Sequence, residues 1–150
     1  MKPEPSKTPK PFLKWAGGKT QLLPELDTRL PEDFRLTVRV YAEPFVGGGA
    51  LLFHLLSKGF RPERVVINDS NPDLANTYRV VQSHAGELVE TLEKLQAAYR
   101  SRTGEDERRA FYIDVRDAYN AGVSDRTTNP VRRTALLVFS TVPASTGFTG

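Results

Sequence analysis

The stretch EPFVGGG, residues 43–49, lies between two apolar segments and decides the expected fold. The segment before it, 38–42, is short and contains β-branched residues, which is typical of a buried strand. The segment after it, 50–58, is strongly apolar and is followed by Gly59, which is typical of a helix that ends at a glycine. Glycines between a strand and a helix allow the backbone to approach a ligand closely.

A second strand is expected at 64–68, followed by a turn at 69–72 and a helix that starts near Leu74. Strand, glycine turn, helix and strand in this order form a βαβ unit with parallel strands. Before this unit, residues 20–30 are patterned as a short helix with Leu22, Leu23, Leu26 and Leu30 on one face. The first half of the chain is therefore expected to be α/β.

The second half is patterned as helices. Apolar residues recur at helical spacing from Leu88 to Tyr99, over 108–120 and over 130–139. Asn129 followed by Pro130 is a favourable helix start. The polar segments at 101–107 and 122–129 are expected to be loops.

Composition excludes several classes of protein. Of 150 residues, 39% are hydrophobic and 26% charged, which suits one globular domain. The absence of cysteine excludes disulfides, cysteine nucleophiles and cysteine-ligated zinc, and with two histidines we expect no metal site. No apolar run reaches the roughly 18 residues of a membrane helix, and the Lys- and Pro-rich N-terminus is unlike a signal peptide. We therefore expect a cytoplasmic protein; the net charge of +3 permits nucleic-acid binding without requiring it.

The glycine turn and a later acid together predict a nucleoside site. Asp69 stands about 20 residues after the turn, where nucleoside-binding folds place an acid for the ribose hydroxyls. A dinucleotide fingerprint would have a small residue three positions after Gly49, where this chain has Leu52. A nucleoside without phosphates, such as S-adenosylmethionine, fits better. The alternative is a glycine-rich surface turn with Asp69 as a cap.

A phosphate loop at Gly17–Thr20 is the weaker alternative, and it would make the chain an NTP-binding domain. That motif requires a preceding strand and a glycine five residues before Gly18, where this chain has Leu13. From spacing alone, Trp15 is expected to be a core aromatic and Lys19 a solvated charge.

Other polar residues give weaker signals. His54, inside the apolar helix, is expected to be a packed core or edge residue, and His84 is expected to lie on the surface. Arginines at 100 and 102, 108 and 109, and 132 and 133 form clusters of the kind that binds phosphates. The acids interleaved with them are equally typical of a solvated helix face.

Three blocks of sequence resemble the Dam-like adenine-specific DNA methyltransferases in order and spacing. They are FLKWAGGK at 12–19, EPFVGGG at 43–49 and NDSNPDL at 68–74. The resemblance is strong over residues 11–80 and continues more weakly through Phe111-Tyr112, Arg116 and Tyr119-Asn120. It implies methyl transfer from S-adenosylmethionine to the exocyclic amino group of adenine in double-stranded DNA, with the base flipped out of the duplex. It also implies a partial Rossmann-like methyltransferase sheet, followed by helices of a DNA-recognition region.

The resemblance further implies which residues bind the cofactor: Trp15, Lys19, Glu43, Phe45, Gly47, Gly49 and Asp69. The first two match positions that contact the cofactor. The glycine turn matches the loop that holds its methionine and ribose portion, and the acid matches the residue that binds the ribose. We expect the complete protein to be a monomer that belongs to a host-maintenance, restriction-modification or phage system.

Four segments are expected on this basis. Residues 1–10 form a flexible arm, 11–80 the S-adenosylmethionine-binding part, 81–139 the helical start of the DNA target-recognition region, and 140–150 an aberrant tail. The family's catalytic motif, Asp or Asn followed by Pro-Pro-Tyr, is absent, because the chain contains no Pro-Pro pair. We therefore expect no catalytic residue and little or no transferase activity from this chain; a non-catalytic cofactor- or DNA-binding remnant is the alternative.

The tail at 140–150 suggests a shift of reading frame. The family follows such a helix with a stretch like Leu-Asn-Arg-Thr-Cys-Phe-Asn-Gly-Phe-Tyr-Arg. With suitable codons, that stretch read from its second base encodes the sequence from Ser140 to Gly150. The hypothesis is that one base was lost near the Phe139 codon. It predicts that restoring the frame in the coding DNA yields Asp-Pro-Pro-Tyr downstream.

Overall fold

The computed structural model describes residues 8–15, 19–122 and 129–141. Four expectations fall wholly or partly outside these residues: the arm at 1–10, the glycines at 17 and 18, the loop at 122–129 and the tail at 140–150. The chain divides into two compact units, Met1–Asn71 and Pro72–Gly150.

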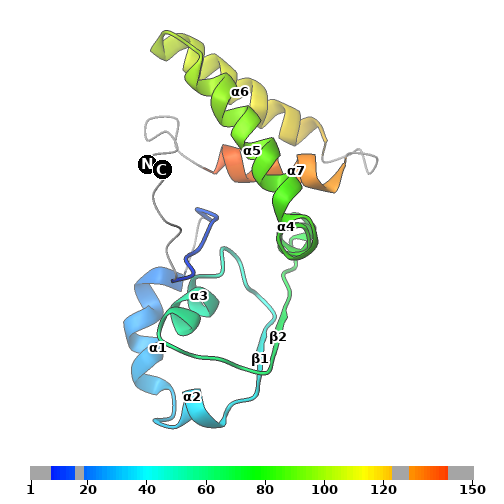
Figure 1. Ribbon diagram of the computed structural model, residues 1–150. Coiled ribbons are helices and arrows are strands. Elements are labelled where there is room, and N and C mark those ends of the chain that lie inside the picture. The colour runs from blue at the N-terminus through cyan, green and yellow to red at the C-terminus, as the bar shows by residue number, and fades with distance from the viewer. Residues whose placement is uncertain (1–7, 16–18, 123–128, 142–150) are drawn as a thin grey trace. The chain divides into compact units, whose positions relative to one another are not determined.

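The first unit contains the expected βαβ arrangement (Figure 1). Strand β1, Val40–Glu43, lies parallel to strand β2, Arg64–Ile67. Helix α3, Ala50–Ser57, connects them, and Gly59 follows it with a φ of 87° that favours glycine. The prediction of parallel strands joined through a glycine turn and an apolar helix is confirmed.

The strands are less buried than the sequence predicts. On β1, Tyr41 and Glu43 are buried whereas Val40 is 58% exposed, and on β2 Val65 and Val66 are exposed. Parallel strands are buried throughout only where layers cover both faces of their sheet. Among the described residues the sheet has two strands. The prediction of a buried strand at 38–42 is therefore wrong for the outward-facing side chains.

The core of the first unit holds α3 against β1. Its buried members are Tyr41, Leu52, Leu55 and Phe60. Phe60 stacks on Phe34 of α2, Phe34–Thr37, with ring centroids 4.8 Å apart. Burying each such side chain contributes about 1.5–3 kcal/mol. Because this cluster fixes the end of β1 and the body of α3, it also fixes both ends of the glycine turn.

The helix predicted at 20–30 has two parts. A 3₁₀ turn, η1, covers Lys19–Leu22 and helix α1 covers Leu23–Arg29. Leu30 packs against the core as expected, whereas Leu22 is exposed. A 3₁₀ turn has three residues per turn instead of 3.6, so the apolar face of the α-helix does not continue through it.

The described part of the second unit consists of helices (Figure 1). They are α4, Pro72–Ser83; α5, Ala85–Arg100; α6, Glu105–Ala121; and α7, Pro130–Ser140. Helix α7 supplies most of the core, since Val131 and every residue over 134–139 are buried. Its side chains form one cluster with α4 and α5 and a second cluster with α6.

The starts of two helices can be compared with those predicted from the sequence. The side chain of Asn129 accepts hydrogen bonds from the N–H groups of Val131 and Arg132, so the predicted cap is confirmed. Helix α6 begins at Glu105, inside the segment 101–107 that was expected to be a loop. Its first turn carries three acids, 105–107, which stabilise a helix N-terminus through the helix dipole. The polar residues of that segment start a helix instead of preceding one.

Candidate functional site

The glycine turn, residues 43–49, leaves the end of β1 and starts α3. Gly47 has a φ of 52° and Gly49, the residue before α3, a φ of 78°. Side chains are disfavoured in this left-handed region, so both positions require glycine for conformational reasons. The N–H of Val46 donates to the carbonyl of Asn68 at 3.0 Å, which ties the turn to the segment after β2.

Gly48 is required for a different reason. A Cβ at this position would lie 3.1 Å from the carbonyl oxygen of Leu13 and 3.3 Å from Cβ of Trp15. Residues 13–15 therefore run directly over the turn, and a side chain at Gly48 would separate the two segments. This is the close backbone approach that the sequence predicts for this turn, although the neighbour here is the chain itself.

Asp69 joins the loops that follow the two strands. Its Oδ2 accepts a hydrogen bond from the N–H of Gly47 at 2.9 Å, and its Oδ1 accepts one from the N–H of Asn71 at 2.9 Å. Each carboxylate oxygen has a second lone pair with which it can accept from a ligand hydroxyl. The structure thus brings Asp69 to the glycine turn, as the spacing predicts.

Lys19 is paired at the turn, although 36% of its side chain is exposed. Its Nζ donates to Oε1 of Glu43 at 2.7 Å and to the carbonyl oxygen of Phe45 at 2.7 Å. Glu43 is 5% exposed, and its Oε2 accepts from the hydroxyl of Tyr41 at 2.8 Å. Burial, together with the Glu43 carboxylate, raises the pKa of Tyr41, so the phenol stays protonated and donates at neutral pH.

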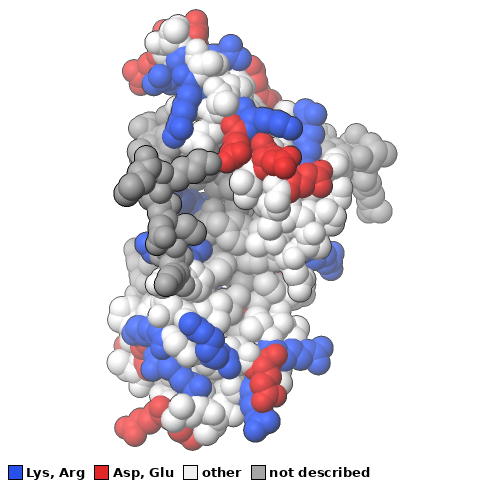
Figure 2. Space-filling view, in the orientation of Figure 1, with Lys and Arg blue, Asp and Glu red and all other residues white. Residues whose placement is uncertain are grey.

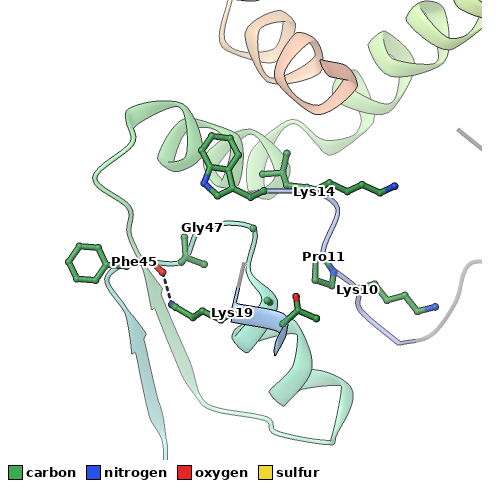
Figure 3. Close-up of a pocket in the computed structure, with 12 residues that line it drawn as sticks. Lys10, Pro11, Lys14, Lys19, Phe45 and Gly47 are labelled. Atoms are coloured by element: carbon green, nitrogen blue, oxygen red, sulfur yellow. Dashed lines mark hydrogen bonds between the residues drawn. The ribbon is translucent and has the colours of Figure 1, made fainter. Parts of the chain in front are cut away.

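A pocket of about 430 Å³ opens beside the turn (Figure 3). Four of the seven predicted cofactor residues line it: Trp15, Lys19, Phe45 and Gly47. Glu43, Gly49 and Asp69 are not among its lining residues. In Figure 3 the ring of Phe45 points away from Lys19, while its carbonyl oxygen receives the lysine. The lining consists of Lys10, Pro11, Leu13, Lys14, Trp15, Lys19, Thr20, Phe45, Val46, Gly47, Gly48 and Ala50.

Some residues of the pocket were not predicted. Lys10 and Lys14 add two basic side chains to the lining, and none of the described lining residues carries a carboxylate. Tyr41 does not line the pocket but holds Glu43 from the core. A strand pattern indicates that Tyr41 faces inward, but it does not indicate which residue accepts the hydrogen bond of its hydroxyl.

The phosphate-loop alternative lacks its strand. Residues 8–15 form no strand, although Gly17 and Gly18 lie outside the described residues. The ammonium group of Lys19 is paired with a buried carboxylate, whereas a phosphate-loop lysine would meet phosphate oxygens. This geometry favours the nucleoside interpretation over the triphosphate one.

His54 lies at the edge of the first unit's core, as expected. Its Nε2 is 2.8 Å from Oδ2 of Asp27 in α1, and Lys58 also pairs with that carboxylate. Hydrogen bonds from Lys58 and His54 hold the pKa of Asp27 below its usual range. These contacts link α1 to α3. Among the described residues, no group of three or more His, Cys, Asp or Glu is placed to hold a metal ion.

The second unit has a hollow of about 570 Å³ with three arginines. It is lined by Tyr99, Glu105, Arg108, Arg109, Tyr112, Ile113 and Arg116. Figure 2 shows Lys and Arg side chains interspersed with Asp and Glu over the visible face of this unit. Charge alone therefore does not separate a phosphate-binding face from a solvated one. No helix in the described part of the chain is long and apolar enough to span a membrane.

Arg133 fits neither interpretation of the arginine clusters. Its Nε donates to Oδ1 of Asp73 at 2.6 Å, and its Nη2 donates to Oδ2 at 2.7 Å. The hydroxyl of Tyr119 donates to Oδ2 as well, and the guanidinium lies 4.8 Å from the centre of the Tyr119 ring. The Arg133 hydrogen bonds hold the pKa of Asp73 below its usual range, and burial raises the pKa of Tyr119 to about 12. Arg133 is thus a largely buried ion-pair residue, and only its neighbour Arg132 is exposed.

The sequence of this chain is similar to the sequences of several DNA methyltransferases. It is 43% identical over 131 residues to the Type II methyltransferase M.MjaIII of Methanocaldococcus jannaschii, which covers 87% of this chain and 44% of that protein. It is 35% identical over 130 residues to the Type II methyltransferase M1.LlaDCHI of Lactococcus lactis subsp. cremoris, covering 87% and 39%. It is 31% identical over 130 residues to a DNA adenine methylase of Haemophilus influenzae, again covering 87% and 39%. The chain spans less than half the length of these relatives.

The sequence also matches a family over most of its length. The match covers residues 15–148, and the family is described as D12 class N6 adenine-specific DNA methyltransferase. It contains all seven predicted cofactor residues, including the whole glycine turn and Asp69. The pocket residues between Lys10 and Lys14 precede it. The chain belongs to the D12 class N6 adenine-specific DNA methyltransferase family.

Proposed function

We propose that the first unit binds S-adenosylmethionine and forms the cofactor-binding part of an adenine-specific DNA methyltransferase. The observation that carries this proposal is the joined pair of loops, in which the Asp69 carboxylate holds the N–H of Gly47 beside the pocket. Family membership supplies the need for a methyl donor. The pocket volume lies within the range of about 300–1,000 Å³ for small-molecule sites.

Each predicted cofactor residue has a place in this proposal. Four of them line the pocket and contact the cofactor directly: Trp15, Lys19, Phe45 and Gly47. Asp69 accepts from the ribose hydroxyls through the lone pairs that its two backbone partners leave over. Gly49 adopts the left-handed backbone conformation at the residue before α3, and Glu43 holds Lys19.

We further propose that residues 81–139 start the DNA target-recognition region of a Rossmann-like methyltransferase and that the partner is double-stranded DNA. Support comes from the family and from the arginines that line the hollow of the second unit. Cations that contact phosphates release counterions, so DNA affinity falls with salt concentration. The exocyclic amino group of a flipped adenine is the proposed methyl acceptor.

Calorimetry with S-adenosylmethionine tests the cofactor proposal. We expect saturable binding by the 150-residue chain, and replacing Asp69 by Ala should weaken it by about tenfold, as expected for the loss of charge-assisted hydrogen bonds. Asp114→Ala, an exposed carboxylate on α6, is the matched control and should bind like the unmodified chain. Absence of binding by the unmodified chain, or preferential binding of ATP, would contradict the proposal.

Two further assays separate the enzyme from the non-catalytic alternative. We expect no methyl transfer from labelled cofactor to duplex DNA by this chain, because it lacks a Pro-Pro-Tyr motif. DNA binding should lose about two units of salt-dependence slope when Arg108 and Arg109 are both replaced by Ala. Arg29→Ala, in the first unit, should leave that slope unchanged. Clear turnover would contradict the first expectation, and an unchanged slope in the double variant would contradict the second.

A further inference from the structure

A series of hydrogen bonds runs from the core of the first unit to the pocket wall. The Tyr41 hydroxyl donates to Oε2 of Glu43, Lys19 donates to Oε1 of the same carboxylate, and Lys19 also donates to the carbonyl of Phe45. Tyr41 and Glu43 are buried and do not line the pocket, whereas Lys19 and Phe45 do. Any effect of Tyr41 on a ligand must therefore pass through its partners.

The geometry makes Glu43 a support and not a ligand contact. It is 5% exposed, and each of its oxygens already has one donor within 2.8 Å. Two of the three donors of the Lys19 ammonium are used by Glu43 and Phe45. The carboxylate thus fixes where the lysine stands, and the lysine fixes the carbonyl of the turn.

Tyr41 is the group that keeps this carboxylate in place. A buried carboxylate oxygen without a donor is unfavourable, so Glu43 would turn toward water if Oε2 lost its partner. Turning would carry Oε1 away from Lys19 and release the lysine from Phe45. The nearby segment that contains Trp15 lies over the same turn, against Gly47 and Gly48.

We propose that Tyr41 is a positioning residue of the cofactor pocket, acting through Glu43 to hold Lys19 against the Phe45 carbonyl. This inference rests on the proposed function for its ligand and not for its geometry. In this proposal Glu43 does not contact the cofactor but positions Lys19, which does. It also gives a role to the Tyr41 hydroxyl, which lies outside the three sequence blocks at 12–19, 43–49 and 68–74.

The test compares Tyr41→Phe with Tyr119→Phe. Both variants remove a phenol that donates to a carboxylate, but Tyr119 donates to Asp73 in the second unit. Trp15, the chain's single tryptophan, lines the pocket and reports on it by fluorescence. The probe ligand is S-adenosylhomocysteine, and urea unfolding shows that each variant is folded under the assay conditions.

We expect Tyr41→Phe to weaken the probe about fivefold, as expected for a hydrogen bond to a charged group, and Tyr119→Phe to leave its affinity unchanged. Glu43→Gln should weaken it at least as much, and adding Tyr41→Phe to Glu43→Gln should have no further effect. That non-additivity distinguishes action through Glu43 from a general loss of stability. Additive effects, or unchanged affinity in folded Tyr41→Phe, would overturn the proposal.

A ligand-free measurement keeps the two proposals distinguishable. In Tyr41→Phe without ligand, we expect acrylamide to quench Trp15 more strongly than in the unmodified chain or in Tyr119→Phe. If the unmodified chain does not bind the probe, the proposed function fails, and the quenching alone decides the positioning role. Equal quenching in all three proteins would then overturn it. If Tyr41→Phe does not fold, the quenching of Glu43→Gln decides in the same way.

Discussion

At the scale of single residues, the pocket depends on glycines, which carry no side chain. Gly48 is the plainest case, because a methyl group there would meet the backbone of Leu13 and the base of the Trp15 side chain. Neither neighbour is the flexible end of a side chain, so relief would require the segment over the turn to move. The three glycines of the turn therefore serve two purposes: backbone conformation at 47 and 49, and space at 48.

We predict that Gly48→Ala weakens S-adenosylmethionine binding by more than tenfold, because the turn and the segment over it separate. The matched control is Gly86→Ala in α5, where an added Cβ meets nothing within 4 Å. That control should leave binding unchanged and stabilise the second unit by about 0.5–1 kcal/mol, since alanine is the better helix residue. Calorimetry and thermal unfolding measure the two effects. Undiminished affinity in Gly48→Ala would show that the close approach has no part in the site.

Asp73 shows how a titrating residue holds helices together. It lies in the first turn of α4, and its partners Tyr119 and Arg133 come from α6 and α7. Its folded-state pKa is lowered, chiefly by the Arg133 hydrogen bonds. The stabilisation is therefore present above the ordinary pKa of aspartate and is lost as pH falls through the lowered folded value.

We predict that Asp73→Asn removes part of the acid limb of the unfolding free energy. The variant should be less stable than the unmodified chain at neutral pH, and the difference should shrink as pH falls below the ordinary aspartate range. Urea unfolding at a series of pH values measures this. Asp117→Asn, an exposed acid on α6, serves as the control. A difference that stays constant down to the lowest pH would exclude the ionised carboxylate as its source.

At the scale of elements, helix starts are set locally and can be tested singly. Replacing Asn129 by Ala removes the acceptor for the N–H groups of Val131 and Arg132. We expect a loss of about 1 kcal/mol in unfolding free energy, as at other helix caps. Asn120→Ala, exposed near the end of α6, should change stability far less. Chemical denaturation distinguishes the two; equal losses would mean that the cap does not stabilise α7.

The sequence predicts elements well where the signal is local. The glycine turn, the apolar α3 and the Asn129-Pro130 start each appear where the pattern places them. The start of α6 differs, because three consecutive acids are typical both of a loop and of a helix N-terminus. Helical periodicity also did not predict that Arg133 is largely buried, because its partner Asp73 is 60 residues away in the sequence.

In the candidate site, too, the features with a local sequence signal were predicted and those that depend on tertiary contacts were not. The residues of the turn and Asp69 come together because the carboxyl ends of parallel strands lie at one edge of a sheet. The partners of Lys19 were not predictable, because they depend on where η1 packs relative to a turn more than 20 residues later in the sequence. Tyr41 was missed for a related reason: inward alternation predicts burial, and only the packed structure shows its hydrogen bond.

At the scale of the whole molecule, the two-stranded sheet leaves apolar side chains in water. Val40, Val65 and Val66 are all more than 40% exposed. Exposed apolar strands at open sheet edges favour pairing between molecules. The sequence did not predict this exposure. An apolar strand pattern indicates that the strand is buried, but it does not indicate which element buries it.

We predict that the chain self-associates as its concentration rises and that Val40→Thr with Val66→Thr reduces this. Threonine keeps the β-branched shape that strands favour but replaces one methyl group by a hydroxyl. Sedimentation velocity over a range of concentrations measures the association. Val89→Thr, an exposed valine on α5, is the control. If that control lowers association equally, the sheet is not its source.

The central position of α7 in its unit has a consequence for synthesis on the ribosome. The first unit is complete in sequence by Asn71, so it can fold while the rest of the chain is still being made. Helices α4, α5 and α6 emerge before α7, yet their clusters with α7 contain much of the unit's buried surface. During that interval their apolar stripes have no common partner. Translation speed through the codons for α6 and α7 therefore governs how long the nascent second unit is exposed to chaperones and proteases.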